Sequence, residues 1–149
     1  MASANRSETF KNLVTAYAIG PPFGDRSDNT IESNVTVFAT VAAAKKFFKA
    51  YADPSAGACL KKASAPKNGK DQSSVTVRAV PATGDQTIDW HTELPQRLPS
   101  SPLLFDAQWV RNGRTVAYYS FEENTDFQEG VQQGVVTSAS QRISQALGK

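Results

Sequence analysis

Apolar residues first recur with helical spacing near the start of the chain. The spacing i, i+3, i+4, i+7 predicts one apolar helix face, formed by Phe10, Leu13, Val14 and Tyr17. Ser7 suits the N-cap, and the Gly-Pro-Pro sequence at 20–22 ends the predicted helix. Residues 1–6 precede it, and we expect them to be disordered or to be an appended start.

A strand followed at once by a helix is the next prediction. Residues 31–39 alternate and are rich in branched side chains, which is typical of a strand. Thr40 is a suitable N-cap for a helix that ends at Asp53-Pro54. Its predicted buried stripe consists of Val41, Ala44, Phe48 and Tyr51, with lysines facing water. Such a helix folds back across the sheet that it has just left.

The middle of the chain predicts a loop and then two strands. Residues 54–73 show no convincing period, so we expect a long mobile loop there. Alternation then predicts a strand over 73–80, with Val75 and Val77 on one face. A weaker strand is predicted over 87–94, followed by a linker broken by three prolines.

The segment from Leu103 to Phe121 gives the strongest local signal. Two strands are joined by Asn112-Gly113, a pair that favours a type I′ hairpin turn, with Arg111 and Arg114 flanking it. Both faces of this hairpin are partly hydrophobic, which suits a central position in a covered sheet or a surface that binds a partner.

The end of the chain predicts a second amphipathic helix. A capping box of Thr125 and Gln128 precedes it, and its apolar row consists of Val135, Ala139, Ile143 and Leu147. The order of elements predicts a single α+β domain over residues 1–149, with a mainly antiparallel β-sheet and amphipathic helices packed on one face.

Composition excludes several classes of protein. The net charge is +2, and the lysines of residues 45–70 lack interleaved aromatic residues, so we expect no nucleic-acid partner. No run reaches the roughly 20 apolar residues of a membrane span, and the start lacks a signal-peptide core. We expect a soluble chain, with any membrane tether outside it. One cysteine, Cys59, excludes an internal disulfide, and one histidine makes a zinc site improbable; no metal or cofactor is expected.

One constellation suggests an enzyme. Asp89 and the only histidine, His91, are two residues apart and share one face of a strand, and Cys59 or a serine would be the third member. This alternative is a small α+β enzyme of the cone-shaped isomerase or dehydratase type, with Asp89 and His91 as acid-base groups.

Aromatic residues suggest a binding site instead. They are concentrated in residues 88–121, where most would form core. The remainder would line a concave apolar pocket with arginines at its rim. The candidate ligand-binding residues are Trp90, Trp109, Tyr118, Tyr119, Arg111 and Arg114.

Four features together carry a family resemblance: the segment TVFATVAAAKKFFKAY, the cysteine of ACL, the hairpin WVRNGRTVAYYSFEE and the closing helix. Over residues 31–147 the chain resembles the actinobacterial extracytoplasmic sensor-like domains, which include the outer domain of PknH-type receptor kinases and small envelope lipoproteins. The resemblance implies a secreted or membrane-tethered module with a cleft for an unknown ligand. Members often form disulfides; Cys59 would match one of those cysteines, but no partner exists for it here.

The leading hypothesis is therefore a non-enzymatic extracytoplasmic ligand-binding or sensor-like domain of the cell envelope. Its partner would be a small apolar or amphipathic ligand, or another protein. A third hypothesis is a structural or protein-interaction module that pairs through an exposed hairpin edge.

Overall fold

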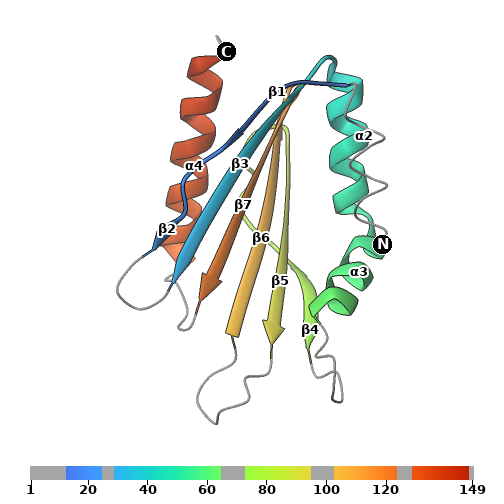
Figure 1. Ribbon diagram of the computed structural model, residues 1–149, viewed down its shortest axis with the longest axis vertical. Coiled ribbons are helices and arrows are strands. Elements are labelled where there is room, and N and C mark those ends of the chain that lie inside the picture. Colours follow the sequence, from blue (N-terminus) through green and yellow to red (C-terminus); the bar gives the residue numbers. More distant parts are fainter. Residues whose placement is uncertain (1–12, 25–28, 65–72, 95–102, 124–128, 148–149) are drawn as a thin grey trace.

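The computed structural model describes residues 13–24, 29–64, 73–94, 103–123 and 129–147. These residues form a single α+β domain in which an antiparallel sheet lies between helices (Figure 1). The strands are β1 (Val14–Ile19), β2 (Phe23–Gly24), β3 (Thr30–Phe38), β4 (Ser74–Arg78), β5 (Gln86–Leu94), β6 (Leu103–Asn112) and β7 (Thr115–Glu123). The helices are α2 (Val41–Ala52), α3 (Pro54–Ser64) and α4 (Glu129–Ala146). The predicted fold class is confirmed.

The β6–β7 hairpin lies in the middle of the sheet. The strand order is β1-β3-β7-β6-β5-β4, every pair is antiparallel, and the short β2 pairs with β3 beside β1. Both strands of the hairpin therefore have a neighbour on each side, as expected for central strands. The hairpin offers no free edge, so pairing through a hairpin edge, as the third hypothesis expected, does not occur in this sheet.

The hairpin turn differs from the predicted one. Asn112 pairs with Thr115, so the turn consists of Gly113 and Arg114 rather than Asn112 and Gly113. Gly113 has φ 59°, and its N–H donates to Asp85 Oδ2 over 2.8 Å. The pairing register is displaced by two residues from the predicted one. Because side chains alternate with period two, the displacement leaves each side chain on its expected face.

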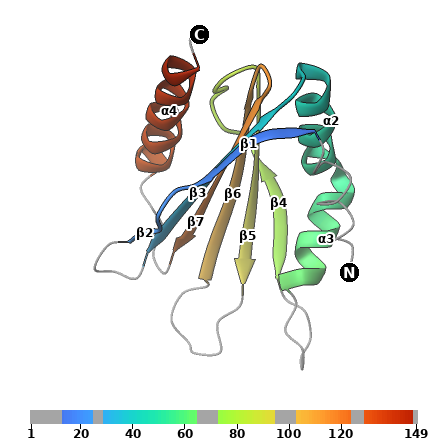
Figure 2. The same cartoon turned by 45° about the horizontal axis from the view of Figure 1, so that its top comes forward.

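Helices cover both faces of the sheet, and this corrects the expectation that they gather on one. In Figures 1 and 2, α2 and α3 lie on one side of the sheet and α4 on the other. Alternate residues of β6 and β7 enter two separate cores: Trp109 and Val116 pack with α2 and α3, whereas Val110 and Ala117 pack with α4. Strands with apolar side chains on both faces require cover on both.

The predicted N-terminal helix is wrong where the structure describes it. Val14–Ile19 form strand β1, which pairs with β3. Tyr17 and Ile19 are 57% and 71% exposed, so the apolar spacing that suggested a helix does not mark a buried face here. Pairing with the edge of β3 satisfies the backbone of this segment, and that tertiary interaction overrides the local pattern. Residues 1–12 of the prediction lie outside the described residues.

The predicted mobile loop is also wrong over its first part, because Pro54–Ser64 form helix α3. Asp53 begins it: its Oδ1 accepts a hydrogen bond from Ser55 N over 2.8 Å. The sequence shows no helical period here because the residues that face the sheet include Ala56 and Gly57, which are too small to form a recognisable apolar stripe. Helix α2 begins as predicted, with Thr40 Oγ1 accepting from Ala43 N over 3.1 Å. Residues 65–72 are not among those described.

Candidate functional site

An apolar cavity of about 320 Å³ lies between the sheet and the helices α2 and α3; we call it the first cavity. Three strands and both helices contribute to its wall. It is lined by Tyr51, Ala56, Cys59, Leu60, Ala63, Trp90, Phe105, Ala107, Trp109 and Tyr118. Its volume lies at the lower end of the range typical of small-molecule sites.

The large rings of the first cavity stand on neighbouring strands of one sheet face. Trp90 belongs to β5, Trp109 to β6 and Tyr118 to β7, and Trp109 lies directly opposite Tyr118 in the ladder. The Trp90 indole N–H donates to the carbonyl oxygen of Tyr51 over 2.8 Å, which satisfies its one polar group and ties its ring to α2. Small residues opposite these rings, such as Ala63, leave the space open.

Gly57 allows α3 to approach Trp90 closely. A Cβ at this position would lie 2.5 Å from Trp90 Cζ3, closer than packed atoms tolerate. Any larger residue there would push either the helix or the ring, and both form walls of the first cavity. Close packing at Gly57 therefore fixes the width of the cavity.

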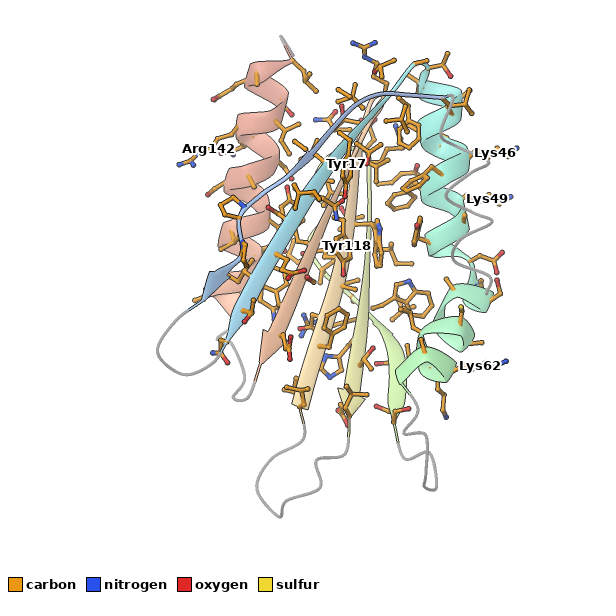
Figure 3. All side chains as sticks on the ribbon, viewed as in Figure 1. Tyr17, Lys46, Lys49, Lys62, Tyr118 and Arg142 are labelled. Carbon is orange, nitrogen blue, oxygen red and sulfur yellow. The ribbon has the colours of Figure 1, made fainter. Side chains whose placement is uncertain are left out.

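A second cavity, of about 290 Å³, adjoins the first on the same face of the sheet. It is lined by Tyr17, Asn34, Thr36, Phe47, Tyr51, Trp109, Val116 and Tyr118. Three of these residues also line the first cavity. They form a continuous aromatic wall: the Tyr51 and Trp109 rings stack with centroids 4.9 Å apart, and Trp109 and Tyr118 are tilted at 4.7 Å. Figure 3 shows Tyr17 and Tyr118 along this side of the sheet.

The candidate residues from the sequence divide into two groups. Trp90, Trp109 and Tyr118 meet in the first cavity. Tyr119, by contrast, is 1% exposed in the core beneath α4, on the opposite face. Helix α3 was not predicted from the sequence, so its Leu60 was not among the candidate residues. Tyr51, which also lines the cavity, was predicted on the buried stripe of α2.

Neither candidate arginine lines these two cavities. Arg111 is buried, and its guanidinium donates to Asp85 Oδ2 over 2.8 Å and to Gln86 Oε1 over 2.6 Å. It holds the β4–β5 loop against the hairpin turn. Arg114 lies exposed in that turn. Alternation along a strand does not show which arginine has a carboxylate partner. The sequence therefore did not distinguish the buried, ion-paired Arg111 from the exposed Arg114.

A polar network lies on the other face of the sheet, beneath α4. Its carboxylates, Asp89 and Asp106, are each 1% exposed. Arg78 joins them: its Nε lies 2.8 Å from Asp89 Oδ2, and its Nη2 lies 2.7 Å from Asp106 Oδ2. Gln132 of α4 completes the network, with Nε2 donating to Asp106 Oδ2 and Oε1 accepting from Arg78. The network therefore connects α4 to three strands.

Burial raises the pKa of Asp89 to about 6. Loss of hydration disfavours the carboxylate, and the nearby Asp106 adds repulsion, while the Arg78 guanidinium acts in the opposite direction. Ionisation of Asp89 is thus less favourable in the folded protein than in the unfolded chain.

His91 pairs with Asp106 rather than with Asp89. Its Nδ1 lies 2.5 Å from Asp106 Oδ1. Asp89 and His91 do share a strand face, as the sequence indicated, but Asp89 is held by Arg78. Cys59 lines the first cavity on the opposite face, so the sheet separates it from His91. No Cys-His pair can form across the sheet, and neither Asp89 nor His91 lines the first cavity.

No helix within the described part of the chain is long and apolar enough to cross a membrane.

Comparison with known proteins shows a likeness at the level of the fold. No protein-family model matches the chain, and no curated protein gives a significant match. Among solved structures, the chain is similar to the extracellular domain of PknH from Mycobacterium tuberculosis, with a TM-score of 0.56 and 14% identity. The likeness covers 91% of this chain and 70% of that one. At this level of identity the comparison shows that the two share a fold.

Proposed function

We propose that this protein is an extracytoplasmic, sensor-like domain of the cell envelope that binds a small apolar or amphipathic molecule in the first cavity. The observation that carries the proposal is the apolar recess framed by Trp90, Trp109 and Tyr118 between the sheet and α3. The shared fold with the PknH extracellular domain supports the location outside the cytoplasm.

The arrangement of groups favours binding over catalysis. Ligand sites are concave and mostly apolar, with a few polar groups that orient the ligand. The first cavity meets this description, since the side-chain polar groups that the described residues bring to it are the hydroxyls of Tyr51 and Tyr118, the thiol of Cys59 and the Trp indoles. The titratable network of Asp89, His91 and Asp106 is on the other face and is engaged by Arg78 and Gln132.

Binding is tested with the uncharged fluorescent probe N-phenyl-1-naphthylamine. We expect saturable 1:1 binding, with energy transfer from the tryptophans of the cavity wall and a rise in melting temperature through mass action on the native state. Ala63→Phe fills the cavity from α3 and is expected to weaken binding at least tenfold. Ala42→Phe is the control, because Ala42 is exposed on α2 and lines neither cavity. No saturable binding to the wild type, or equal binding by both variants, would refute the proposed site.

The location is tested through Cys59, which is exposed and is the only cysteine in the chain. We expect a membrane-impermeant maleimide to label the natural protein at this residue in intact cells. A Cys59→Ser variant provides the background. Labelling at Cys59 that appears only after the cells are lysed would place the domain in the cytoplasm and overturn this half of the proposal.

A further inference from the structure

The first and second cavities lie side by side and share Tyr51, Trp109 and Tyr118 as a common wall. We treat the two together as one groove that follows this wall. Both open on the sheet face that carries α2 and α3. Each volume alone is near the lower limit of a small-molecule site, whereas both together fall well within the usual range. The groove therefore suits an elongated ligand.

The two ends of the groove differ in chemistry. The α3 end is lined by aliphatic and aromatic groups, among them Leu60 and Phe105. The other end carries Asn34 and Thr36 of β3, whose side chains share a face with the buried Phe38. Amide and hydroxyl groups on the inner side of a strand are unusual, because an apolar residue would bury surface more favourably there. Tyr17 adds a second hydroxyl, and so a third polar side chain, at this end.

The described residues bring no charged side chain to the groove. Among them, no Asp, Glu, Lys, Arg or His lines either cavity. On α2 and α3, Lys46, Lys49 and Lys62 point away from the sheet (Figure 3). Burial raises the pKa of the Tyr118 hydroxyl above its ordinary value of 10, so this group adds no charge to the groove. A charged ligand group would lose its hydration here without gaining a counter-charge from the described lining residues.

We infer that the ligand is an uncharged, single-chain amphiphile. Its apolar chain lies in the first cavity between Trp90 and α3, and its hydroxyl- or amide-bearing head lies in the second cavity beside Asn34 and Thr36. The inference rests on the proposed function and adds the class, the orientation and the charge of the ligand.

The test compares two amphiphiles with the same chain length, each below its micelle concentration. Decyl glucoside has an uncharged head rich in hydroxyl groups, and decanoate at pH 8 has a charged one. Displacement of N-phenyl-1-naphthylamine gives both affinities. We expect decyl glucoside to bind at least tenfold more tightly. Decanoate that binds as tightly as the glucoside, or more so, would overturn the inference.

The orientation is tested with Thr36→Val, which removes a hydroxyl and preserves the shape of a strand residue. We expect it to weaken glucoside binding by about five- to tenfold and to leave probe binding unchanged, because one hydrogen bond to the head is lost. Thr115→Val is the matched control, since Thr115 is buried on the opposite face of the sheet. Urea unfolding confirms that both variants are folded. If Thr36→Val binds the glucoside as tightly as the wild type does, the orientation is refuted. If the wild type does not bind the probe at all, the proposed function itself is refuted.

Discussion

Replacing Arg78 with methionine is expected to lower the free energy of unfolding at pH 7 by about 3 kcal/mol, the cost typical of removing one partner from a buried ion pair. Arg78 is the cation that contacts both Asp89 and Asp106, at 2.8 and 2.7 Å. Methionine retains much of the apolar stem but leaves two carboxylates, each 1% exposed, without this partner. Urea unfolding monitored by tryptophan fluorescence measures the loss.

Two comparisons show whether the loss is electrostatic. Adding Asp89→Asn and Asp106→Asn to Arg78→Met neutralises the network, so most of the stability is expected to return. Arg142→Met is the surface control: Arg142 is exposed on α4 and points away from the sheet in Figure 3, and its replacement is expected to change stability by less than about 0.5 kcal/mol. If Arg78→Met is no more harmful than Arg142→Met, the network does not hold the sheet and α4 together.

The network gives the two faces of the sheet different roles. On one face, Arg78 and Gln132 fix α4 to the strands through short, charge-assisted hydrogen bonds. On the other face, Trp90 and Trp109 project from the same strands into an open groove. Because the network fixes these strands on the α4 face, their side chains on the groove face are held in place. This reduces the conformational entropy lost when a ligand binds.

Much of the sheet could be predicted because its strands are strongly alternating. The alternation predicted over residues 31–39 is confirmed, since Val35 packs beneath α4 whereas Phe38 packs beneath α2 and α3. Val75 of β4 also packs beneath α2 and α3. The failures share a cause. At the start of the chain a helical spacing was present but local, and residues 54–64 showed no convincing period. Tertiary contacts decided both structures: pairing with β3 for one and packing against Trp90 for the other.

The candidate site was half predictable for a similar reason. Trp90, Trp109 and Tyr118 belong to strands whose alternation was readable, and the structure brings them together. Tyr119 follows Tyr118 directly and therefore faces the other way. The polar network could not be found, because seeing that Arg78 lies between Asp89 and Asp106 requires the register of three strands, which depends on loops and turns rather than on composition.

The pKa of Asp89 leads to an unusual dependence of stability on pH. In the folded protein the pKa is about 6, above the ordinary value of 3.8, so the folded state retains a proton that the unfolded chain has already lost. The favourable contribution of this group is fully present below about pH 3.8 and is lost as the pH rises through 6. The difference between the two pKa values corresponds to about 3 kcal/mol. Asp89 therefore makes the protein less stable at pH 7 than at pH 4, opposite to the effect of a carboxylate whose pKa is lowered by an ion pair.

Comparison with Asp89→Asn isolates this effect from the other titrating groups. Asparagine preserves the shape and cannot ionise, so we expect the variant to gain about 2 kcal/mol relative to the wild type between pH 4 and pH 7, measured by urea unfolding at half-unit steps. Glu32→Gln removes the same charge from an exposed position of β3 and is expected to give a curve parallel to that of the wild type. Parallel curves for Asp89→Asn would show that burial does not raise this pKa. A wild type that instead gains stability relative to the variant as the pH rises would show that attraction to Arg78 outweighs the loss of hydration, because the pKa would then lie below its ordinary value.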